Sequence, residues 1–95
     1  IKIGNEVPHE FGLSQNYPNP FNPTTNINFY LPAGGIVRIC IYDLFGKEVS
    51  VITERFFPPG TYSAIIDGNL LSSGIYFCVM RSGSFSFTRK IVMVK

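Results

Sequence analysis

The stretch Ile36–Val51, IVRICIYDLFGKEVSV, decides the fold class of this chain. Every second residue of Ile36–Tyr42 is apolar, from Val37 onward, which is the period of a half-buried β-strand. The segment Asp43–Lys47 then supplies a turn whose glycine is free to take a positive φ, and apolar alternation resumes at Val49. The stretch therefore predicts a β-hairpin.

The same signals recur on both sides of this hairpin. Alternation over Asn26–Leu31 predicts a strand before it, and Ile75–Arg81 is apolar at both parities, which predicts a strand in the centre of a sheet. Further short strands are predicted over 54–57, 61–67 and 85–94. About seven strands at a spacing of roughly 8 to 12 residues predict an all-β chain, an immunoglobulin-like antiparallel β-sandwich. The residues expected to form its turns include Asp43, Gly46, Asp67 and Gly74.

Length and charge narrow the function classes. The 95 residues suffice for one domain with a modest core. The net charge is only +2 and the eight basic residues are scattered, so we expect no nucleic-acid partner. The apolar runs are far shorter than the roughly 20 residues of a spanning helix, so we expect no transmembrane segment. The chain starts with Ile and not Met, which favours a piece of a longer protein.

Residues 1–12 lack a sustained period and are interpreted as a linker or cleavage-region segment, with the folded domain over residues 13–95.

Few side chains are suited to catalysis or metal binding. The chain has one His, two Asp, four Glu and two Cys. His9 lies in the irregular N-terminal segment, and both aspartates adjoin glycine-containing turns, where an Asp side chain commonly bonds to backbone amides. Cys40 shares its parity with polar neighbours, whereas Cys78 lies in the strand expected to be buried on both sides. We therefore expect no enzyme activity, no metal and no cofactor, and we favour two free thiols over a disulfide.

The segment Asn16–Thr25, NYPNPFNPTT, cannot be a helix and is a poor strand, because each proline removes a backbone donor. Prolines lower the conformational entropy of the segment, which reduces the ordering cost when a partner binds Tyr17 or Phe21. The alternative is that these prolines only fix a chain reversal while both rings pack onto the sandwich.

The segment Leu13–Thr25 resembles, residue for residue, the opening motif of the type A C-terminal sorting domain of the type IX secretion system (Por secretion system) of Bacteroidetes. Ile41–Asp43, Ser73–Phe77 and the basic, apolar end Lys90–Lys95 are similar to later family motifs. Ile66 stands where the family commonly has tryptophan.

This resemblance implies a non-catalytic secretion signal. Its expected partners are the outer-membrane translocon, shuttle proteins, a sortase that cleaves ahead of the domain body, and a cargo domain N-terminal to it. The expected location is the periplasm in transit, then the cell surface or the medium. Candidate partner-recognition residues are Tyr17, Pro18, Asn19, Pro20, Phe21, Asn22, Pro23, Lys90 and Lys95.

Two other interpretations stay open. Lys90 and Lys95 are also explained by edge solubility, because lysines discourage unwanted strand pairing. The domain as a whole is also compatible with a carbohydrate-binding or spacer sandwich of a secreted hydrolase, with Tyr30 and Tyr42 as exposed rings, although the chain contains no Trp.

Overall fold

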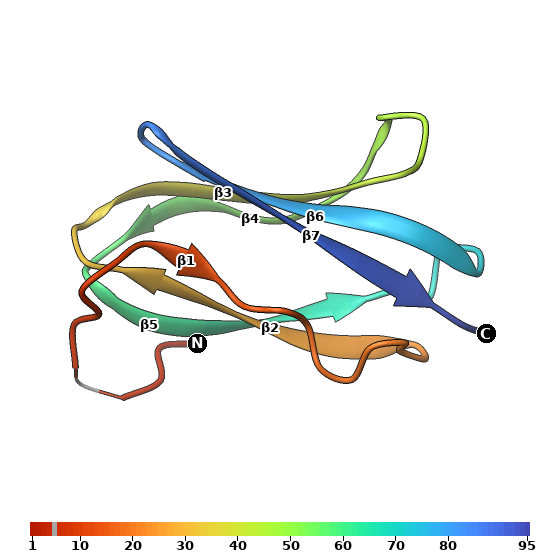
Figure 1. Cartoon of the computed structure of the whole chain (residues 1–95), viewed down its shortest axis with the longest axis horizontal. Coiled ribbons are helices and arrows are strands. Elements are labelled where there is room, and N and C mark those ends of the chain that lie inside the picture. The colour runs from red at the N-terminus through yellow and green to blue at the C-terminus, as the bar shows by residue number, and fades with distance from the viewer. Residues whose placement is uncertain (5) are drawn as a thin grey trace.

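The structure is a computed structural model that describes residues 1–4 and 6–95. In these residues it is all-β, as predicted, and its strands form two antiparallel sheets that pack face to face (Figure 1). One sheet has the order β1-β2-β5 and the other β4-β3-β6-β7. The strands are β1 (Gly12–Leu13), β2 (Thr24–Leu31), β3 (Gly35–Tyr42), β4 (Glu48–Phe57), β5 (Gly60–Asp67), β6 (Gly74–Ser82) and β7 (Phe85–Met93).

The period-2 pattern of the sequence determines which side chains enter the core. In β2 and β3 every second residue is fully buried, because the two sheets bring their apolar faces together. Phe29, Phe57 and Tyr62 form an aromatic cluster, with ring centroids 4.9 to 5.3 Å apart. Tyr62 donates its hydroxyl hydrogen bond to the Pro58 carbonyl at 2.7 Å, so this buried polar group is satisfied.

Most predicted strands are present, and one prediction was wrong. Residues 54–57 do not form a separate strand, since β4 runs unbroken from Glu48 to Phe57. The pairing of β4 with β3 shifts register between Ile39 and Cys40. Because of this irregularity, the apolar residues of β4 do not keep one alternation along the whole strand. The prediction of a central strand over Ile75–Arg81 is confirmed, because β6 pairs with β3 on one side and β7 on the other.

The first residues contact the sandwich at two places. Ile1 and Ile3 hydrogen-bond to the edge of β5, and the ring of Phe11 stacks on Phe85 with centroids 4.2 Å apart. Gly12 belongs to β1, which pairs with β2.

Both cysteines are free thiols and both are buried. Cys78 points into the core, opposite Ile41 in the register, whereas Cys40 pairs with Val79 on the outer face of the same sheet. The two side chains therefore point away from each other, and no disulfide joins them. Burial raises the pKa of both thiols, that of Cys78 to about 12.

Within residues 1–4 and 6–95 there is no helix long and apolar enough to cross a membrane.

Candidate functional site

The candidate site is the proline-rich segment Asn16–Thr25, which connects β1 to β2 and lies against the last strand. In Figure 1 it is the orange loop ahead of β2, at the end of the sandwich where the chain terminates. β7 is an edge strand, and the backbone N–H and C=O groups of Lys90, Val92 and Val94 point away from its partner β6. The proline-rich segment covers this part of the edge.

Three hydrogen bonds hold the segment on the last strand, and a fourth comes from Gln15, the residue before the segment. The Phe21 N–H donates to the Val92 carbonyl at 2.9 Å, and the Val94 N–H donates to the Phe21 carbonyl at 3.0 Å. The Val92 N–H donates to Asn19 Oδ1 at 3.0 Å, and Gln15 Nε2 donates to the Lys90 carbonyl at 2.7 Å. A covered edge cannot pair with another chain, so the segment protects the last strand along these residues.

A small polar network fixes the shape of the segment. Asn16 is buried, and its Nδ2 donates to the Pro18 carbonyl at 3.2 Å and to Thr25 Oγ1 at 3.1 Å. Thr25 Oγ1 donates to the same Pro18 carbonyl at 2.7 Å. The Tyr17 backbone pairs with Asn26, which brings the two ends of the segment together. The segment is therefore a closed loop that also packs against β7. The peptide bonds before Pro18, Pro20 and Pro23 are cis.

The two rings of the segment have opposite environments. Phe21 is 1% exposed, beside Gly68 and Met93, whereas Tyr17 is 81% exposed. A Cβ on Gly68 would lie 2.5 Å from the Met93 sulfur, so any larger residue there would force the Met93 side chain to move. Phe21 thus packs into the sandwich, and Tyr17 is displayed to solvent. The remaining segment residues, Pro18, Asn19, Pro20 and Asn22, are exposed, and Pro23 is partly buried.

The neighbouring loops are held by aspartate side chains. Asp43 Oδ1 accepts hydrogen bonds from the backbone N–H groups of Phe45 and Lys47, both at 2.9 Å, and Gly46 has a φ of 81°. Asp67 Oδ1 accepts one from the Asn69 N–H at 2.9 Å. The bonds from Phe45 and Asn69 are Asx turns, and the bond from Lys47 closes the longer loop around Asp43, so both loops are fixed locally without help from the core.

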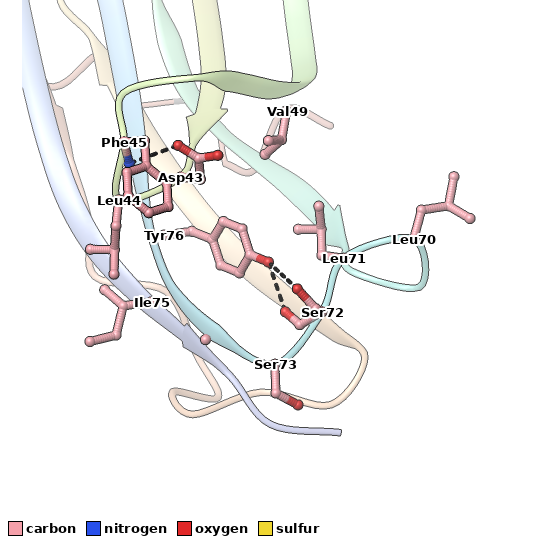
Figure 2. A pocket seen from close by; sticks show the side chains of 11 residues that line it. Asp43, Leu44, Phe45, Val49, Leu70, Leu71, Ser72, Ser73, Ile75 and Tyr76 are labelled. Carbon is pink, nitrogen blue, oxygen red and sulfur yellow. Dashed lines mark hydrogen bonds between the residues drawn. The ribbon is translucent and has the colours of Figure 1, made fainter.

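Between these two loops lies an open pocket of about 420 Å³ (Figure 2). Its rim carries Leu44, Phe45 and Leu70, whose side chains are largely exposed. Its floor includes Tyr76, whose hydroxyl donates to the Ser72 carbonyl at 2.7 Å. The pocket can accept an apolar side chain, and the carboxylate in its lining, Asp43, is bonded to loop amides.

The C-terminus lies next to this pocket. The Lys95 N–H donates to Ser73 Oγ at 2.8 Å, and Lys95 Nζ donates to the Asn69 carbonyl at 3.2 Å. Lys90 is exposed on β7, at the position whose carbonyl accepts the bond from Gln15. Gly74, the predicted turn glycine, begins β6 with a φ of 156°.

The ion pairs among the described residues lie elsewhere. Arg38 bridges Glu48 at 2.7 Å and Glu54 at 2.9 Å on the outer face of the four-stranded sheet. The hydrogen bond from Arg38 lowers the pKa of the Glu48 carboxyl. His9 is exposed in the N-terminal segment. Within residues 1–4 and 6–95, no three His, Cys, Asp or Glu side chains lie close enough to hold a metal ion.

The two tyrosines considered for carbohydrate binding do not form one platform. Tyr30 is on the outer face of the three-stranded sheet, because its strand neighbours Phe29 and Leu31 point inward. Tyr42 is on the outer face of the other sheet, where its hydroxyl approaches Glu48. Both rings are half-buried, and they face opposite sides of the molecule.

Sequence reasoning missed the residues that assemble the site. Gln15, Asn16 and Thr25 belong to the motif Leu13–Thr25, but the sequence pattern assigns them no role, and Gly68 is not among the predicted site residues. A polar residue on each side of a proline-rich loop indicates side chains that fix the loop, because such residues commonly bond to loop backbone. The contact with β7 leaves no such local signal.

The comparisons with known proteins agree with this geometry. A search of the curated proteins found no match to this chain. A family model described as the secretion system C-terminal sorting domain matches residues 15–95, which include the proline-rich segment and the whole of β7. This family comprises the C-terminal sorting signals of type IX secretion, which are generally non-catalytic and imply export to the cell surface or the extracellular space. The chain therefore belongs to the family of secretion system C-terminal sorting domains.

Proposed function

We propose that this domain directs an N-terminal cargo through the outer-membrane type IX machinery, and that the exporter reads one composite surface. This surface consists of the proline-rich segment and the last strand. The observation that carries the proposal is that Gln15, Asn19 and Phe21 bond to the backbone of Lys90, Val92 and Val94. Two family motifs at opposite ends of the domain are thus parts of one structure.

The composite surface is preorganised, which favours recognition. Its loop backbone is already fixed by the Asn16 network and by β7, so binding a partner orders few residues. Tyr17 offers an exposed aromatic ring, and aromatic residues are enriched at the energetic centres of interfaces. Lys90 and Lys95 add positive charge on the last strand and at its end, which increases the rate of encounter with an acidic partner.

After translocation, we propose that a sortase cuts ahead of the domain body, in the segment before β1. The residues Glu6, Val7, His9 and Glu10 are exposed there, as a protease substrate must be. Removal of the domain would release the cargo or allow its attachment to the cell surface.

A reporter fusion tests the proposal. A signal peptide, a reporter and this chain are joined in that order and expressed in a host with type IX secretion. We expect reporter at the surface or in the medium for the native chain, and periplasmic retention for Tyr17→Ala and for the double variant Lys90→Glu, Lys95→Glu.

Phe56→Ala is the matched control, because Phe56 is an exposed aromatic residue that lies away from the composite surface. It is on β4, at the opposite edge of the four-stranded sheet from β7. This control should be exported normally. Retention of the native fusion in the periplasm would refute the function, and normal export of both surface variants would refute the proposed recognition surface.

A further inference from the structure

The edge of β5 already holds an added strand. The Ile3 N–H donates to the Thr61 carbonyl, the Ser63 N–H donates to the Ile1 carbonyl, and the Ile1 nitrogen donates to the Ser63 carbonyl, each at 2.7 Å. Lys2 lies opposite Tyr62 in an antiparallel bridge. Residues 1–3 therefore extend the three-stranded sheet by one short strand.

The same edge continues beyond this short strand without a partner. Ile65 is opposite Asn26 in the register, and Asn26 directs its own N–H and C=O to Tyr17 on the other side. The N–H and C=O of Ile65 therefore point to the free edge, where no residue of 1–4 or 6–95 bonds to them. The Ile65 side chain is 63% exposed. A strand that continued past Ile1 would pair here.

A mainly apolar pocket lies beside this unpaired stretch. It has a volume of about 340 Å³, and its lining includes Phe29, Ile52, Phe57 and Ala64 together with the polar residues Asn26, Thr53, Arg55 and Ser63. The antiparallel register of Lys2 and Tyr62 puts Ile1 opposite Ser63 and the residue directly ahead of Ile1 opposite Ala64. Ala64 packs against the core, so the side chain opposite it would point into the pocket.

We propose that the β5 edge and this pocket form a docking site for the extended peptide joined ahead of Ile1, with a large apolar side chain opposite Ala64. The inference rests on the proposed function for the presence of a cargo chain there. Three observations support this peptide as the occupant of the site. Residues 1–3 already pair with the β5 edge, the Ile65 backbone groups on that edge have no partner among residues 1–4 and 6–95, and Ala64 is too small to fill the pocket. The cargo is then joined through a paired strand instead of a flexible tether.

Three extended chains test this docking site. One carries Ser-Thr-Leu ahead of Ile1, one carries Ser-Thr-Asp, and the third carries Ser-Leu-Thr, which moves the leucine to the outward position opposite Ile65. We expect Ser-Thr-Leu to raise the melting temperature by at least about 4 °C over Ser-Thr-Asp, because it buries a leucine side chain. Ser-Leu-Thr should stay within about 1 °C of Ser-Thr-Asp.

Hydrogen exchange at one amide gives a second readout. The Ile65 amide should exchange at least about tenfold more slowly in the Ser-Thr-Leu chain than in the chain without an extension. Filling the pocket from β5 by Ala64→Leu should remove most of the advantage of the leucine extension. Equal melting temperatures for the three extensions, or an Ile65 amide that exchanges as fast as before, would overturn the docking site.

These outcomes are independent of export. Stabilisation by Ser-Thr-Leu with no export of the reporter would leave the docking site standing and refute the secretion function. Normal export with no stabilisation would support the secretion function and refute the docking site.

Discussion

At the scale of single residues, the rings of Phe21 and Tyr17 in the proline-rich segment have different roles. Phe21 is buried beside Met93, whereas Tyr17 is exposed, so only Tyr17 is available to a partner. We expect Phe21→Ala to lower the free energy of unfolding by about 3 kcal/mol, because a buried aromatic side chain leaves a cavity. Tyr17→Ala should change it by less than about 0.5 kcal/mol. Urea denaturation measures both, and equal losses would show that Tyr17 is also a packing residue.

A buried thiol makes stability depend on alkaline pH. Burial raises the pKa of Cys78 in the folded chain from 9.0 to about 12. Between these values the unfolded chain has lost the thiol proton and the folded chain has kept it, so the folded state binds more protons and stability falls as pH rises.

We expect the free energy of unfolding to fall between about pH 9 and about pH 12, and to fall less steeply in Cys78→Val, which has no thiol to ionise. Urea titrations of both chains at each pH provide the comparison. Cys40 stays in both, so its own titration cancels. Parallel pH profiles would mean that Cys78 ionises as readily in the folded state as in the unfolded one.

At the scale of elements, β7 has one covered part and one open part. Val92 and Val94 donate their amides to Asn19 and Phe21, whereas the Thr88 amide, on the same edge, has no acceptor among residues 1–4 and 6–95. We expect slow hydrogen exchange at Val92 and Val94 and fast exchange at Thr88.

The variant Asn19→Ala removes only the acceptor of Val92. Its amide should then exchange about fivefold faster, which corresponds to the loss of a hydrogen bond of about 1 kcal/mol. Val94 serves as the internal control, since its bond goes to a backbone carbonyl that the variant keeps. If both amides accelerate together, Asn19 holds the whole segment and not a single contact.

The sequence predicted the elements better than their contacts. Alternation identified β2, β3 and β5, because a period of two leaves no choice about which face is buried. It failed over residues 54–57, where the bulged pairing with β3 breaks the parity. It could not predict that Gln15 reaches Lys90, 75 residues away, because the acceptor is a backbone carbonyl that every residue possesses. A hydrogen bond to a backbone carbonyl does not restrict which residue type carries that carbonyl.

At the scale of the whole molecule, the proposed composite surface is complete only when the last strand is present. The proline-rich segment lies near the start of the domain, yet Phe21, Asn19 and Gln15 bond to residues between positions 90 and 94. The proposed recognition surface is therefore a tertiary feature and not a linear peptide. A chain that lacks its end would present the segment without its support.

A truncation separates folding from recognition. A chain that ends at Arg89 loses Ile91 and Met93, which are 0% and 1% exposed, together with every β7 partner of the segment. Each of these two side chains contributes about 2 to 5 kcal/mol, against a total stability of about 5 to 15 kcal/mol for a small domain. We expect the truncated chain to lose its cooperative urea transition. The double variant Lys90→Ser, Lys95→Ser keeps the core and should keep the transition. If the truncated chain still unfolds cooperatively, then the last strand is dispensable for folding, and an export defect of the truncation would have to come from lost recognition alone.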